Sequence, residues 1–134
     1  MRAPTALLVA AVLIATAACA VTKDTGRPFS SKARHQLVVD RTTPREAEKL
    51  LGPPVTTTKD AEGRERWTYE YTRVSALRAV PFGRRLTVSQ TPYEQLVLTF
   101  RNGRLSECAY LIERYRTEDD IIVATGAERE ACAK

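Results

Sequence analysis

An Asn-Gly pair between two alternating apolar runs constrains the fold of this chain more than any other feature. Asn102 and Gly103 both tolerate the left-handed backbone of a two-residue turn, so the pair is the strongest short-range hairpin signal that a sequence offers. The runs on either side, 94–100 and 104–113, place apolar residues at alternate positions. This period is typical of strands that bury one face. The sequence therefore predicts an antiparallel hairpin centred on this turn.

The register of the hairpin raises a problem at Glu107. A regular two-residue turn would pair Leu98 with Glu107 and put the carboxylate on the buried face, where an unpaired charge costs several kcal/mol. One extra residue near Ser106 or Glu107 keeps Leu105 inside and also turns Cys108 and the apolar residues after it inward. We therefore expect a β-bulge at this point.

Two helices and a third strand are the other regular elements that the sequence predicts. Residues 43–51 begin with a capping box and a proline at the first helical position, and Gly52 ends the helix. Residues 29–39 carry apolar side chains at roughly helical spacing, which favours a first, shorter helix. Residues 66–74 alternate aromatic with polar side chains and predict a strand.

The amino-terminal segment has the layout of an export signal. Arg2 is followed by ten apolar residues over 6–15 and by small residues before Cys19, whereas a membrane-spanning helix takes about 20 apolar residues. Cys19 looks like the modified cysteine of the bacterial lipobox, which implies a signal peptide over 1–18 and palmitate or similar acyl chains on this residue. Thr16 stands where the lipobox usually has Leu, so an ordinary secreted protein stays open as the alternative.

The remaining chain is expected to form one domain on a short tether. Residues 19–28 are short and polar, which suits a tether, and residues 29–134 are enough for one modest core. Removal of the signal lowers the formal net charge from +5 to +4, too diffuse to indicate nucleic acid. Cys108 and Cys132 remain as an even pair in an oxidising compartment, where a disulfide is expected and two free thiols are the alternative.

A long basic connection precedes the hairpin. Residues 75–92 contain no acidic residue and lie in a stretch with four arginines interleaved with apolar side chains. They form either a projecting loop that meets a partner or a membrane surface, or an edge ribbon with solvated arginines. The candidate partner contacts are Phe82, Arg84, Arg85 and Tyr93.

No set of residues indicates catalysis. His35 is the only histidine, no serine lies in a nucleophile-elbow motif, and the sequence has no glycine-rich phosphate loop and no His/Cys metal spacing. We therefore predict no catalytic residue, metal or cofactor, and a protein that is not an enzyme and takes no small-molecule substrate.

The order of the motifs resembles the SmpA/OmlA (BamE-like) family of small outer-membrane lipoproteins. The segments that carry the likeness are Thr42-Thr43-Pro44-Arg45-Glu46, Leu51-Gly52-Pro53-Pro54, Trp67-Thr68-Tyr69, Leu96-Val97-Leu98-Thr99-Phe100 and Asn102-Gly103-Arg104-Leu105. They cover roughly residues 37–112. The resemblance implies an α+β fold in which two N-terminal helices pack on a three-stranded antiparallel sheet, with the C-terminal tail clamped here by the cysteine pair.

The same resemblance implies a function. Family members of this type are non-enzymatic accessory subunits of the machinery that inserts β-barrel proteins, lipid-anchored on the periplasmic face of the outer membrane. Ala20 agrees with that location, because an Asp at this position usually retains a lipoprotein in the inner membrane. The expected partners are other envelope proteins. The alternative is a periplasmic proteinaceous enzyme inhibitor, since similar two-helix-and-sheet units occur in such inhibitors.

Overall fold

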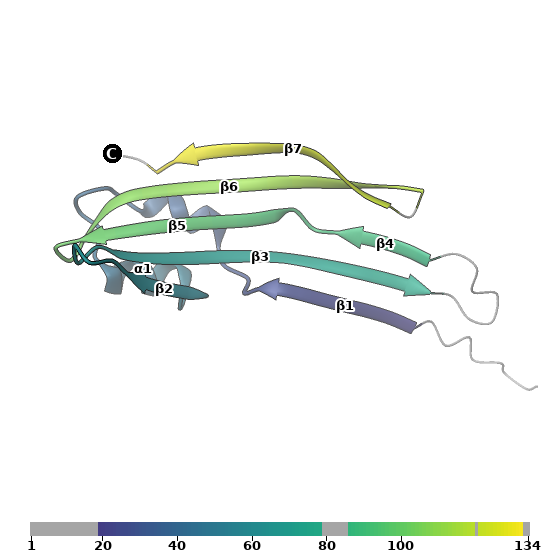
Figure 1. The fold of residues 1–134 in the computed structure, drawn as a ribbon, viewed down its shortest axis with the longest axis horizontal. Helices are drawn as coiled ribbons and strands as arrows, with labels where there is room; N and C mark the ends of the chain where they lie inside the picture. Colours follow the sequence, from purple (N-terminus) through teal and green to yellow (C-terminus); the bar gives the residue numbers. More distant parts are fainter. Residues whose placement is uncertain (1–18, 79–85, 120, 133–134) are drawn as a thin grey trace, which may run out of the picture.

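One antiparallel sheet dominates the molecule (Figure 1). The computed structural model describes residues 19–78, 86–119 and 121–132. These residues form seven strands, a 3-10 helix and an α-helix: β1 (Cys19–Gly26), η1 (Ser31–Gln36), α1 (Pro44–Leu51), β2 (Thr56–Lys59), β3 (Glu65–Arg78), β4 (Leu86–Gln90), β5 (Tyr93–Arg101), β6 (Arg104–Glu118) and β7 (Ile121–Ala131).

The sheet is organised around the long strand β3. The main strand order is β1-β3-β5-β6-β7, and β2 and β4 also pair with β3. Figure 1 shows β2 and β1 following one another along one edge of β3, with β4 and β5 in line along the other. The sheet is therefore long in the strand direction, with β7 and the β1–β2 line at its two edges.

The hydrophobic core lies at one end of one sheet face. In Figure 1 the helices lie behind the sheet near the β5–β6 turn. They cover an aromatic and aliphatic layer in which Tyr69, Leu96 and Leu98 are almost completely buried. Leu37 and Leu51, next to and within the helices, pack into the same cluster. In the described part of the chain, no helix covers the opposite face of the sheet.

The local predictions for the second helix and the hairpin are confirmed. Thr43 accepts a hydrogen bond from the amide of Glu46, and the Glu46 carboxylate accepts one from the amide of Thr43, which is the expected capping box. Asn102 and Gly103 adopt positive φ values of 52° and 74° at the hairpin turn. Both features depend on residues only a few positions apart.

The predicted bulge is confirmed as well. Thr99 pairs with Glu107 and Phe100 with Leu105, so Ser106 is the extra residue. Leu105 and Cys108 consequently both lie in the core, while Glu107 is exposed. Avoidance of a buried carboxylate explains the shift.

The expected fold class, two N-terminal helices packed on a three-stranded antiparallel sheet, is wrong. Three segments without a strand signal pair with longer neighbours as β1, β2 and β7. The long strands β3 and β6 expose backbone amides and carbonyls along their edges, and these groups require hydrogen-bond partners. These three segments supply those partners, although none of their described side chains is buried.

The first predicted helix is also shorter than expected. Residues 31–36 form a 3-10 helix, Ser30 provides no side-chain cap, and Leu37 is already extended with ψ of 128°. Phe29 precedes the helix, and its ring packs against Tyr69 with the two centroids 5.8 Å apart. The apolar residues of 29–39 therefore reach the core from a short helix and its extended flanks, not from one face of a longer helix.

Two predicted connections are largely strand. Of the segment 19–28, expected to be a tether, Cys19–Gly26 pairs with β3 along its whole length. Of the basic connection 75–92, the ends belong to β3 and β4, which pair with each other. The part that contains Phe82, Arg84 and Arg85 lies outside the described residues. None of the helices that the structure describes is long and apolar enough to cross a membrane.

Candidate binding surfaces

The sheet face that turns away from the helices presents a row of four polar side chains. Thr58 of β2 pairs with Arg66 of β3, Arg66 pairs with Thr99 of β5, and Thr99 pairs with Glu107 of β6. Residues directly opposite in antiparallel strands point to the same face. Since strands lie about 4.8 Å apart, Arg66 and Glu107 are separated by about 10 Å across the row.

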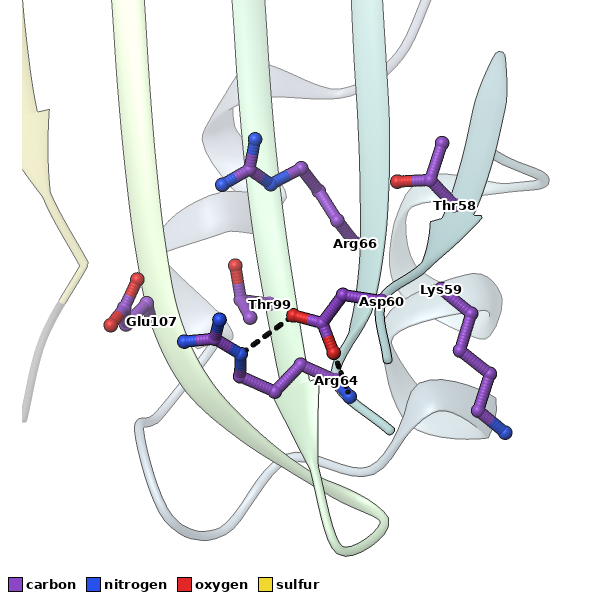
Figure 2. A pocket seen from close by; sticks show the side chains of 7 residues that line it. All are labelled: Thr58, Lys59, Asp60, Arg64, Arg66, Thr99 and Glu107. Atoms are coloured by element: carbon purple, nitrogen blue, oxygen red, sulfur yellow. Dashed lines mark hydrogen bonds and ion pairs between the residues drawn. The ribbon is translucent and has the colours of Figure 1, made fainter. Parts of the chain in front are cut away.

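A polar cleft of ≈ 380 Å³ lies along this row (Figure 2). Its lining residues are Thr58, Lys59, Asp60, Arg64, Arg66, Thr99 and Glu107. Figure 2 shows these side chains in front of the sheet, with the helices behind it. The cleft therefore opens on the uncovered face.

Asp60 and Arg64, at one side of the cleft, are hydrogen-bonded to each other. Asp60 accepts from the amides of Glu62 and Arg64 at 3.0 and 2.9 Å and from Arg64 Nε at 2.7 Å. The amide of Arg64 contributes most to holding the pKa of Asp60 below its usual range. This carboxylate is thus ionised and saturated, which makes it a structural element of the turn rather than a general base.

The centre of the cleft retains free polar groups. Among the described residues, Arg66 and Glu107 make no ion pair, and both are exposed. Thr99 is only 8% exposed, and no hydrogen bond of its hydroxyl occurs within the described part of the chain. The cleft therefore presents a cation, a hydroxyl and an anion in a line, an arrangement suited to recognising a polar ligand.

The only histidine of the chain lies on a helix, away from the row of polar side chains in the cleft. His35 lies on η1, at the face opposite the cleft, with Nε2 2.8 Å from Arg34 Nη1. No group of three metal-ligating side chains occurs among residues 19–78, 86–119 and 121–132.

Cys19, the predicted lipidation residue, begins β1 at the end of the sheet remote from the helices (Figure 1). Its backbone is in register with Arg78, the last residue of β3. Three of the large apolar side chains that remain exposed lie at this end: Val21 at 67%, Ile121 at 65% and Val123 at 39%. The residue predicted to carry the anchor and the core are therefore at opposite ends of the molecule.

The two cysteines expected to pair do so in the structure. Cys108 and Cys132 form a disulfide with their Cα atoms 5.3 Å apart, which joins the residue after β7 to β6. Beside it, the Arg34 guanidinium lies 4.1 Å from the ring centroid of Tyr110 and forms an ion pair with Glu130 of β7. Disulfide and ion pair hold the end of the edge strand to the covered face.

Tyr93 is the one predicted partner contact with a described side chain. It is half-buried at the start of β5, and its hydroxyl donates to Glu70 Oε2 at 2.9 Å and accepts from Gln95 Nε2 at 3.1 Å. Burial first, and then the hydrogen bond to Glu70, raise the pKa of Tyr93 to about 12. Its hydroxyl is therefore bound within the sheet's own polar network.

Sequence reasoning missed Arg66, Thr99 and Glu107 as a group. They come from three strands, and their alignment depends on the register around the bulge. The available signal was that all three occupy solvent-facing positions of the predicted strands. That pattern alone did not separate them from other surface residues.

Comparisons with protein-family models, curated proteins and solved structures found no match to this chain. The likeness to the SmpA/OmlA family therefore stays a prediction from motifs, and the fold that it implied is wrong.

Proposed function

We propose that this chain is a non-enzymatic lipoprotein of the outer membrane that is anchored through Cys19 and serves as an accessory, scaffolding subunit for another envelope protein. One observation carries the proposal. Cys19 is in register with Arg78 at one end of β3, and the cleft residue Arg66 lies near the other end. At about 3.4 Å per residue, the strand separates the two positions by roughly 40 Å.

The way β1 is held supports a rigid arm. Pairing with β3 begins at Cys19 itself, so no free linker lies between an acyl group there and the sheet. Arg73 also donates from Nε and Nη2 to the two carboxylate oxygens of Asp24 on β1, at 2.6 and 2.9 Å. An anchored sheet of this kind would present its cleft at a defined distance from the membrane.

The cleft supports recognition of a protein partner. A partner surface with an acidic side chain opposite Arg66 and a basic side chain opposite Glu107 would match the two charges. Exposed charge pairs of this kind contribute to orientation and selectivity more than to raw affinity. This is the behaviour required of a subunit that positions a partner.

Anchoring is tested with Cys19→Ser in a Gram-negative host. The wild-type protein should incorporate a clickable palmitate analogue and sediment with outer-membrane fractions, whereas the variant should be unlabelled and soluble in the periplasm. The amount of disulfide-linked protein should be the same in both. Equal membrane association of the unlabelled variant would refute the anchor.

Scaffolding is tested by affinity capture after mild detergent extraction, followed by mass spectrometry. The wild type should capture outer-membrane assembly proteins, and the paired change Arg66→Glu with Glu107→Lys should release them while leaving the palmitate label unchanged. Recovery of the protein alone, with normal barrel levels in a deletion strain, would count against the proposal. Capture of a hydrolase that loses activity on binding would identify an inhibitor instead.

A further inference from the structure

A second concave surface lies at the helical end of the molecule, separate from the cleft. It is a groove of ≈ 720 Å³ between the turn after η1, the helix α1 and the start of β6. Its lining residues are Gln36, Val38, Arg41, Thr42, Glu46, Lys49, Leu50 and Arg104. These residues come from three separate segments of the chain.

Three of the four charged side chains that line this groove are basic. Arg41, Lys49 and Arg104 line it, and none of them forms an ion pair within the part of the chain that the structure describes. Glu46 is the only acidic lining residue. The Glu46 carboxylate accepts hydrogen bonds from the Thr43 amide at 2.9 Å and from the Thr43 hydroxyl at 3.1 Å. The bond from the amide contributes most to lowering the pKa of Glu46.

The rim of the groove is built by hydrogen bonds rather than left as loose loop. Asp40, with a positive φ of 65°, donates from its amide to the carbonyl of Leu105 at 2.7 Å, and the amide of Leu105 donates to the carbonyl of Thr42 at 2.8 Å. Arg104 Nη1 donates to the carbonyl of Arg41 at 3.0 Å. These bonds hold Arg41 and Arg104 beside one another across two segments.

The floor of the groove contains apolar surface. Val38, after η1, and Leu50 of α1 both line the groove, and each is partly exposed. A small anion would use the cations and leave this apolar surface in water. A peptide with both acidic and apolar side chains would use both, because burial of apolar area adds to the affinity that the charges provide.

We propose that this groove binds an acidic segment of a partner protein, with carboxylates between Arg41, Lys49 and Arg104 and an apolar side chain against Val38 and Leu50. The charge of the lining carries the assignment, because three cations without an ion pair among the described residues outnumber one acid, whose Oε2 is already bound by Thr43. It rests on the proposed binding role of the protein and is independent of the Cys19 anchor.

The test uses the purified full chain with its disulfide intact and a fluorescein-labelled nonapeptide of three Leu-Glu-Glu units. Fluorescence anisotropy should give saturable binding below 1 mM that weakens as NaCl rises from 50 to 500 mM. Arg41→Glu combined with Lys49→Glu should weaken binding at least tenfold. Lys49→Glu alone, at an exposed side chain in the last turn of α1, should weaken it several-fold while the protein stays folded.

Matched controls decide whether the site is the groove. Lys32→Glu makes the same charge change on η1 outside the groove lining, and it should bind within twofold of wild type. The proposal is overturned if the double variant binds within twofold of wild type, if Lys32→Glu weakens binding equally, or if a Leu-Gln-Gln peptide binds as tightly. It is also overturned if no saturable binding occurs, or if 10 mM phosphate or anionic vesicles displace the peptide completely. These outcomes leave the Cys19→Ser and cleft experiments unaffected, so the two proposals fail separately.

Discussion

The edge strand β7 should depend on the Cys108–Cys132 disulfide for its order. Every residue of β7 except Ile122 is exposed, and among the described residues its only strand neighbour is β6. The disulfide links positions 24 apart in sequence. In the chain-entropy model, a loop of that size corresponds to a stabilisation of about 3.5 kcal/mol, less any strain in the folded state.

The perturbation is Cys132→Ala. Cys108 is buried and stays in the core as a free thiol, which packs like a small apolar side chain, so no cavity arises at its position. We expect the free energy of unfolding to fall by about 2–3.5 kcal/mol. The Arg34–Glu130 ion pair should weaken as the end of β7 separates from β6.

Two measurements check this prediction. With a urea m-value of about 1.5 kcal/mol per M, the circular-dichroism midpoint should fall by about 1.3–2.3 M. Hydrogen exchange should accelerate most in β7 and in the facing amides of β6, which open locally, and in β3 by no more than the fall in global stability. Reduced wild-type protein should match the variant. A loss below about 1 kcal/mol with unchanged protection of β7 would refute the reasoning.

Three further predictions concern the strands β1, β3 and β5. Gly26→Ala should lower stability by more than about 2 kcal/mol, because φ is +78° and a Cβ would lie 2.0 Å from the carbonyl oxygen of Glu70; an unchanged melting temperature would contradict this. Arg73 lowers the pKa of Asp24, chiefly by its hydrogen bond. The ion pair therefore stabilises the folded protein fully above about pH 3.9, the pKa of an unfolded Asp, and this stabilisation is lost as the pH falls through the lower pKa of the folded state. Asp24→Asn should therefore be less stable than wild type at pH 7, and a difference of equal size at pH 2 would disprove the linkage. The pKa of Tyr93 is raised to about 12, so the stabilisation that the protonated hydroxyl gives the folded protein is complete below about pH 10 and is lost as the pH rises through 12. Tyr93→Phe should therefore remove one late step from the absorbance titration at 295 nm.

Some features of this protein follow from residues close together in the sequence. The capping box at Thr43 and Glu46, the turn at Asn102 and Gly103, and the bulge at Ser106 each depend on only a few neighbouring residues. Short-range hydrogen bonds and the cost of burying a carboxylate are enough to specify them. The pairing of Cys108 with Cys132 also followed from the cysteine count, once Cys19 was assigned to the predicted anchor.

Other features were decided only by the tertiary structure. The segments of β1, β2 and β7 were not predicted as strands, and they are ordered because β3 and β6 present unpaired backbone groups beside them. The fold expected from the motifs therefore missed the width and the length of the sheet.

The two candidate binding sites were also decided only by the tertiary structure. Arg66 and Glu107 share a row only through the pairing of three strands, and Arg41 and Arg104 share a groove only because a turn docks on β6. The sequence by itself determined the elements with local signals and the chemistry of the side chains. Which side chains meet was decided by long-range pairing, because register and docking depend on contacts between residues far apart in the chain.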